Sequence, residues 1–212
     1  MQIAIMVAGA LAELVGWHLV ATGRFGVWKL MPVVLGAMGT AVVIAAPPVA
    51  AADVTATSAL VVGLGSGFAL YLGTRAFVWA ATRWALFRRD VERKYGEAGQ
   101  VTLARSLVLS LAVMVPAEEL FWRGLVQGRL DDSATAAAAA ALGWCAYVVA
   151  NAASRSVSIV AGAIVGGALW AGLAWWSGGV LAALASHILW TGLMLALPPG
   201  AGRRAIEGGA AR

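Results

Sequence analysis

Residues 103–128 read LARSLVLSLAVMVPAEELFWRGLVQG, an apolar run that carries three charges near its C-terminal end. A helix that crosses a bilayer needs about 20 apolar residues. Each charged side chain at the centre of such a helix costs on the order of 3 kcal/mol. Glu118, Glu119 and Arg123 therefore need partners or a function. This segment points to a membrane protein and marks the place to look for a site.

The rest of the chain has the composition of a membrane protein. Of its 212 residues 61% are apolar and 12% charged, and the mean hydropathy is +0.84, whereas a soluble domain carries about 25% charged residues. We therefore predict an all-α fold, a polytopic transmembrane helical bundle that forms a single membrane domain over residues 1–212. Its spans, about seven by this criterion, are expected near 2–21, 31–52, 58–80, 103–128, 134–153, 157–175 and 178–197.

The basic residues indicate how the chain is oriented. The stretch 83–100 (RWALFRRDVERKYGEAGQ) is the one polar connection, and we place segment 81–102 in the cytoplasm. Alternation of the spans then brings most of the basic residues to that side. They are twelve of the fifteen: Arg24, Lys29, Arg83, Arg88, Arg89, Arg93, Lys94, Arg105, Arg155, Arg203, Arg204 and Arg212.

This distribution predicts an integral protein with its N-terminus outside and its C-terminus in the cytoplasm. The alanine- and glycine-rich composition is typical of bacterial proteins, which places it in the bacterial inner (cell) membrane. Short basic segments between apolar runs favour orientation over nucleic-acid binding. We therefore expect membrane lipid, and no nucleic acid, among the partners.

Spacing within the charged segment separates the two glutamates. Glu119 and Arg123 are four residues apart, so they share a helix face and can pair. Glu118 lies about 100° around the helix and is free to face a cavity. Pro116 suits the first turn of a restarted helix. One acid can then stay ionised as an anchor while the other takes a proton from water. The alternative is that Arg123 and one glutamate form an ion pair that only positions helices. This alternative does not explain the second glutamate.

Polar residues in other spans are candidates to join this site. His187 and Thr191 are four residues apart in the last span, so both can face one cavity, where a histidine can donate a hydrogen bond or exchange a proton. Asn151 can hold a water or a developing oxyanion. A packed histidine and a helix-to-helix asparagine bond are the plainer interpretations. Glu13 and His18, five residues apart in the first span, favour a local structural or interfacial role.

These segments, in this order, resemble the membrane family of CAAX prenyl proteases and bacteriocin-processing proteins. That family carries Glu-Glu-x-x-x-Arg, Phe-x-x-x-His and His-x-x-x-Asn motifs on successive helices. The first motif matches in full at Glu118, Glu119 and Arg123, and the histidine of the third matches at His187. The chain is thus identified as similar to this family in its C-terminal half.

The resemblance covers residues 103–197, which implies a protease-like core there and variable N-terminal helices over residues 1–102. The chain departs from the family at two positions. Asn151 stands where the second motif has histidine, and Thr191 stands where the third has asparagine. An asparagine can orient water but cannot accept and relay a proton. Thr191 keeps a hydrogen-bond donor with a shorter reach.

The resemblance implies an intramembrane, metal-independent, glutamate-type endopeptidase that cleaves a peptide or membrane-protein substrate. By the family's pattern Glu118 is the base that activates water, oriented by Glu119 and Arg123. His187, with Asn151 or Thr191, would hold the oxyanion. Since at most one histidine lies in this site, a catalytic zinc with three protein ligands is not expected, and we expect neither a metal nor a cofactor.

Two other functions remain open. A family member that has lost catalysis would bind a membrane protein or a lipid-linked peptide, or act as a scaffold, and the replacement of histidine by Asn151 motivates this hypothesis. A proton-coupled carrier could use Glu13, Glu118 and Glu119, because intramembrane acids commonly serve transport. The sequence lacks the matched pair of broken helices that is typical of inverted-repeat transporters.

Overall fold

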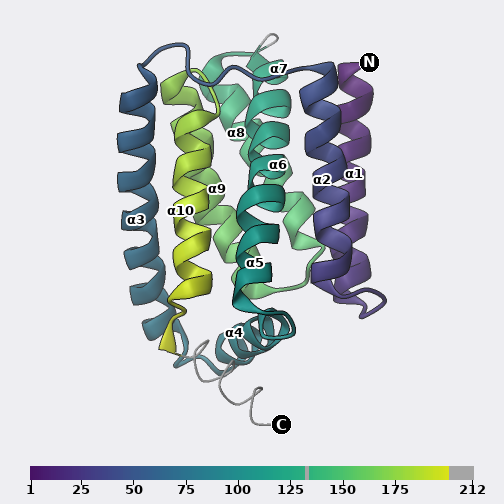
Figure 1. The fold of residues 1–212 in the computed structure, drawn as a ribbon, viewed down its shortest axis with the longest axis vertical. Coiled ribbons are helices and arrows are strands. Elements are labelled where there is room, and N and C mark those ends of the chain that lie inside the picture. The colour runs from purple at the N-terminus through teal and green to yellow at the C-terminus, as the bar shows by residue number, and fades with distance from the viewer. Residues whose placement is uncertain (132–133, 201–212) are drawn as a thin grey trace.

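The computed structural model describes residues 1–131 and 134–200, which form a bundle of roughly aligned helices (Figure 1). The long rods are α1 (Gln2–Ala21), α2 (Val27–Ala45), α3 (Ala56–Ala81), α8 (Ala136–Ala152), α9 (Val157–Ser177) and α10 (Leu181–Ala196). A further rod is built from five helical parts in sequence: α5 (Leu103–Leu109), η1 (Ser110–Met114), α6 (Val115–Glu119), η2 (Leu120–Gln127) and α7 (Gly128–Asp131). Helix α4 (Ala85–Ala98) lies across one end of the bundle.

Each predicted span coincides with one of these rods, and the prediction of an all-α membrane bundle is confirmed. Helices α1, α2, α3 and α9 are long and apolar enough to cross a bilayer, while α8 and α10 are apolar but shorter. The second span differs from the prediction because α2 starts at Val27 and ends at Ala45. Pro47 and Pro48 follow, and a proline disfavours helical backbone in the residue before it.

The bundle is polar at its centre and apolar on its outer surface. Exposed aliphatic side chains occur on several rods, for example Leu11, Val61 and Val165. By contrast, several charged and amide side chains are buried: Glu13, Glu118, Glu119, Arg123, Gln127, Asn151 and His187. This distribution suits a hydrocarbon solvent, in which polar groups turn toward the protein interior.

Helix α10 packs closely against α3, and glycine makes this possible. A methyl group on Gly63 would lie 2.5 Å from the carbonyl oxygen of Ala182, and one on Gly67 would lie 2.5 Å from the carbonyl oxygen of Ser186. Small residues at four-residue spacing let two backbones approach in this way. The contact fixes the position of α10, the helix that carries His187.

Helix α4 coincides with the polar segment predicted at 83–100. Asp90 on α4 accepts hydrogen bonds from the backbone N–H (2.8 Å) and the hydroxyl (2.7 Å) of Ser158 and from the hydroxyl of Ser156 (2.8 Å). Burial opposes the charged form of Asp90, but these bonds and one from Arg93 outweigh burial and hold the pKa of its carboxyl below the ordinary value. Asp90 thereby ties α4 to the start of α9.

The ends of the rods follow the alternation that the orientation prediction requires. In Figure 1 the α1–α2 and α8–α9 connections lie at the same end of the bundle as α4, and α10 also ends there. Helix α1 begins at the opposite end. Three basic residues used in that prediction, Arg203, Arg204 and Arg212, lie outside the described residues.

Candidate active site

The two motif glutamates lie between two π-helical stretches of one rod. η1 ends at Met114 and η2 begins at Leu120, so Pro116, Glu118 and Glu119 occupy the α-helical turn between them. Pro116 lies in the first turn of α6, as the sequence predicted, although the rod continues into α6 from η1 without a break. A π-helical turn shifts the backbone hydrogen-bond pattern by one residue, which can accommodate the missing N–H of proline. Such turns are frequent at functional sites.

Glu119 is the anchor of the site. Its side chain is fully buried, and one oxygen lies 2.8 Å from Nδ1 of His187. The other oxygen lies 3.5 Å from Nε of Arg123. The predicted pairing of Glu119 with Arg123 is confirmed. Glu119 was also expected to orient the base Glu118, but the residue that it contacts directly is His187. The pair of Glu119 and Arg123 therefore holds the histidine of the third motif in place.

Arg123 connects this rod to α8 and α9. Nη2 donates a hydrogen bond to the carbonyl oxygen of Gly167 at 3.2 Å. The guanidinium carbon lies 4.5 Å from the ring centre of Tyr147 and 5.6 Å from that of Trp170. A desolvated cation over aromatic faces contributes about 2 kcal/mol. Arg123 is thus held on both sides, and its charge balances the carboxylate of Glu119.

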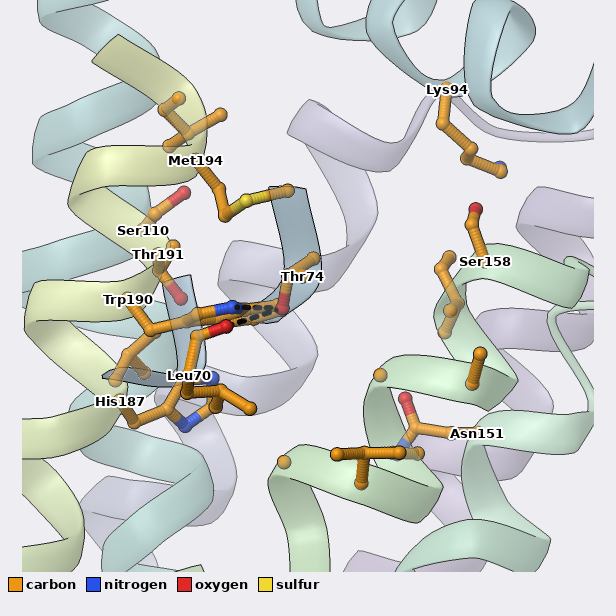
Figure 2. A pocket seen from close by; sticks show the side chains of 18 of the residues that line it. Leu70, Thr74, Lys94, Ser110, Asn151, Ser158, His187, Trp190, Thr191 and Met194 are labelled. Carbon is orange, nitrogen blue, oxygen red and sulfur yellow. Dashed lines mark hydrogen bonds between the residues drawn. The ribbon is translucent and has the colours of Figure 1, made fainter. Parts of the chain in front are cut away.

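His187 is fixed in place by two neighbours. Its ring stacks on Trp170, with the ring centres 3.5 Å apart and the planes at 15°. Because Glu119 takes Nδ1, the other ring nitrogen, Nε2, is the one left for a ligand. With Nδ1 protonated, Nε2 accepts a proton when the ring is neutral and donates a hydrogen bond when the ring is charged. Thr191 lies one turn further on and faces the same cavity (Figure 2).

A cavity of about 640 Å³ joins the predicted site residues. Glu118, Asn151, His187 and Thr191 all line it, and it extends to α4, where Lys94 lies at its edge. Glu118 is buried and makes no hydrogen bond or ion pair with any residue in 1–131 or 134–200. The prediction that this acid faces a cavity is confirmed. Among the residues that the structure describes, Glu119 has bonded partners and Glu118 has none.

Asn151 lies across the cavity from His187 and Thr191 (Figure 2). Its Nδ2 donates to Oε1 of Glu13 at 3.2 Å and to the carbonyl oxygen of Tyr147 at 3.0 Å. An amide nitrogen has two hydrogens, so both are used, and the amide oxygen is the atom left for the cavity. In this orientation Asn151 can accept a hydrogen from water. It cannot donate to an oxyanion, which was one of its expected roles.

Glu13 belongs to this group of residues, although the sequence favoured a local role for it. It is fully buried, and it accepts hydrogen bonds from Nε1 of Trp122 at 2.8 Å and from Asn151. An acid inside the membrane carries a large free-energy cost. This argument identified Glu118 as a candidate site residue, and applied to Glu13 it would have identified that residue too. His18, the other titratable residue of the first span, is exposed on α1.

Comparison with known proteins finds a family that part of the chain resembles. Residues 100–193 match the family described as Type II CAAX prenyl endopeptidase Rce1-like. The matched segment contains every site residue predicted from the sequence, from Glu118 to Thr191, and the resemblance is confirmed over it. No curated protein and no solved structure gives a match.

Proposed function

We propose that the protein is an intramembrane endopeptidase, because residues 100–193 match the Rce1-like family of CAAX prenyl endopeptidases. It hydrolyses a peptide bond of a membrane-associated protein or peptide. The observation that carries this proposal is Glu118, a buried carboxylate that has no hydrogen-bond partner among the described residues and shares a cavity with His187. Residues 103–197 form the protease-like core of the single membrane domain, and residues 1–102 supply variable helices around it.

Glu118 acts as the general base. It removes a proton from a water in the cavity, and the water oxygen attacks the carbonyl carbon of the substrate to form a tetrahedral oxyanion. The same carboxyl then returns the proton to the nitrogen of the scissile bond. The carbon–nitrogen bond breaks, and a carboxylate and an amine leave. The carboxylate of Glu118 suits this role because, in the part of the chain that the structure describes, no neighbour bonds to its proton-accepting oxygens.

His187 and Thr191 stabilise the oxyanion. In its charged form His187 donates a hydrogen bond through Nε2, and Glu119, 2.8 Å from Nδ1, stabilises that charge. The hydroxyl of Thr191 offers a second donor from the same wall of the cavity. Groups fixed before the reaction stabilise developing charge most effectively. The stack of His187 on Trp170 supplies that fixation.

The proposed reaction is metal-independent, because the side chains of Glu13, Glu119 and His187, which could bind a metal ion, are bonded to other residues of the protein. Glu119 and His187 are bonded to each other, and Glu119 also faces Arg123. Glu13 accepts from Trp122 and Asn151. In residues 1–131 and 134–200 no three His, Cys, Asp or Glu side chains form a group that could hold a metal ion. The expected partners are a peptide or membrane-protein substrate and the surrounding lipid.

Glu118→Gln tests the proposal most simply. The substitution keeps the size of the side chain but removes the base, so we expect turnover of an internally quenched, S-farnesylated CAAX peptide to fall by about 100-fold or more. The matched control is Glu92→Gln on α4, which makes the same chemical change outside the cavity. Unchanged turnover in Glu118→Gln, with the protein correctly inserted, would sink the assignment of the base.

A non-catalytic membrane binding or scaffold protein is the alternative function. It is favoured by Asn151, whose amide cannot relay a proton and whose two hydrogens are already engaged. Asn151→His discriminates between the two functions. If cleavage appears or rises sharply in this variant, the chain is a weakened protease. Robust turnover by the wild-type protein would eliminate the binding-only alternative.

A further inference from the structure

Glu13 enters the site from a helix that lies outside the segment matched by the family. Helix α1 ends at residue 21, whereas the family match begins at residue 100. Glu13 is fully buried, and its two oxygens accept from different donors. Oε2 accepts from Nε1 of Trp122, within the charged segment, and Oε1 accepts from Nδ2 of Asn151 on α8. Glu13 therefore links the two walls that carry Glu118 and Asn151.

The chemistry of these bonds requires a carboxylate at residue 13. Trp122 can only donate, and the Asn151 nitrogen can only donate. An ionised carboxylate accepts at both oxygens, whereas a glutamine has one acceptor oxygen and one donor nitrogen. A glutamine at residue 13 would leave either Trp122 or Asn151 facing another donor. No orientation of that amide satisfies both neighbours as they stand.

The second hydrogen of Asn151 points to the carbonyl oxygen of Tyr147. Two acceptors thus hold the amide nitrogen, and the amide oxygen is the polar atom left for the cavity that Asn151 and Glu118 both line. An asparagine without such neighbours could present either its oxygen or its nitrogen, because the two groups are nearly equal in size. The carboxylate of Glu13, together with the Tyr147 carbonyl, removes this ambiguity.

We propose that Glu13 is a positioning residue of the site: it orients Asn151 so that the amide oxygen accepts a hydrogen from the water that Glu118 activates. The catalytic consequence rests on the proposed function, whereas the orientation of Asn151 does not. Glu13 itself is not among the residues that line the cavity. It acts through Asn151, which takes the place of a histidine in the family's second motif.

The orientation can be measured without a substrate because Asn151 is the only asparagine in the chain. Nitrogen-15 labelling of asparagine side chains gives one amide signal in the full-length protein in detergent micelles. We expect its two hydrogens to exchange slowly with water in the wild type and about tenfold faster or more in Glu13→Gln, since one acceptor is lost. Glu92→Gln on α4 is the matched control and should leave the rate unchanged. Equal exchange rates in the wild type and Glu13→Gln would overturn the proposal.

A charge swap covers the case in which Glu13→Gln fails to fold. In Glu13→Gln with Asn151→Asp, Trp122 donates to the glutamine oxygen and the glutamine nitrogen donates to the new aspartate. An acceptor oxygen still faces the cavity, and the total charge is unchanged. The double variant loses one hydrogen bond, the one from residue 151 to the carbonyl oxygen of Tyr147. Asn151→Asp alone brings two carboxylates together and should be the least stable of the three variants.

The kinetic test uses the same farnesylated peptide. We expect Glu13→Gln to lower kcat about tenfold or more with little change in KM, and the swap to return kcat to within about threefold of wild type. A purely structural role would change the yield of folded protein but not kcat per folded molecule. Wild-type kcat in Glu13→Gln, or a swap no more active than that variant, would contradict the proposal.

The two measurements separate this inference from the proposed function. If the wild-type protein cleaves no peptide, the proposed function fails, and the exchange rates still decide whether Glu13 orients Asn151. If Glu118→Gln abolishes cleavage but the exchange rates are equal, the protease proposal survives and the role of Glu13 is refuted.

Discussion

Glu118 and Glu119 are adjacent in the sequence, but the fold gives them opposite surroundings. Glu119 is bonded to His187 and faces Arg123, whereas Glu118 has no bonded partner in the described part of the chain. Removing the charge of a paired buried group leaves its partner uncompensated, while removing an unpaired buried charge does not. The same substitution at the two positions should therefore have different effects on stability.

We predict that Glu119→Gln lowers the free energy of unfolding by about 3 kcal/mol, because Arg123 then stays buried without its counter-charge. Glu118→Gln should change it by no more than about 0.5 kcal/mol in the destabilising direction, and could raise it. Chemical unfolding in detergent micelles measures both. Equal destabilisation by the two variants would contradict the assignment of anchor and free acid.

Helical spacing predicted the contact between Glu119 and Arg123 and the exposure of Glu118 to a cavity, because both depend on positions within one helix. The bond between Glu13 and Asn151 could not be predicted in that way. These residues are 138 positions apart, and their contact depends on how α1 packs against α8. The orientation of the Asn151 amide depends in turn on that contact.

At the scale of the element, the close packing of α3 and α10 leads to a second prediction. Gly67→Ala places a methyl group 2.5 Å from the carbonyl oxygen of Ser186, which should destabilise the protein by about 1–3 kcal/mol. Gly65→Ala is the matched control, because nothing lies within 4 Å of its added methyl group. Unfolding measurements on both variants test this. Equal stability would mean that the helices are not in contact at Gly67.

The bond between α4 and α9 leads to a prediction about pH. The pKa of Asp90 is lower in the folded protein than its ordinary value of 3.8, so its stabilising contribution is present above pH 3.8 and is lost as pH falls through the folded-state pKa. Asp90→Asn should be less stable than the wild type at neutral pH. The difference in unfolding free energy between the wild type and Asp90→Asn should shrink as the pH is lowered below 3.8. A difference that does not vary with pH would refute this.

Apolar run length predicted the rods, because a bilayer sets the length of a helix that crosses it. It could not predict the π-helical stretches on either side of α6, since these depend on backbone hydrogen-bond register around Pro116. Pro47 and Pro48 indicate that α2 ends before them. The predicted span nevertheless continued to residue 52, because residues 46–52 are apolar.

At the scale of the whole molecule, the positions of the basic residues lead to a prediction of topology. In a Cys145→Ser background, we expect Ala52→Cys, between α2 and α3, to react with a membrane-impermeant maleimide in intact bacterial cells. Arg88→Cys on α4 should react only after the membrane is permeabilised, because the basic residues predict that α4 lies on the cytoplasmic side. The opposite pattern of labelling would reverse the proposed orientation.

Composition was enough to predict a membrane bundle, because so low a charged fraction and so high a mean hydropathy are typical of proteins that fold in a bilayer. It could not predict that a cavity would reach from α4 at one end to Glu118 in the interior. That cavity is a property of the assembled rods. Of the buried acids Glu13, Glu118 and Glu119, Glu118 is the one that lines it, and the proposed hydrolysis requires water to reach that acid through the cavity.

The most direct test of the account is cleavage of the farnesylated peptide in oxygen-18 water by the wild type and by Glu118→Gln. If Glu118 activates water, mass spectrometry will find one solvent oxygen in the new carboxylate of the wild-type product. The variant will give no product above background. Equal cleavage and labelling with the variant would contradict the central claim that Glu118 is the base of a membrane-embedded peptidase.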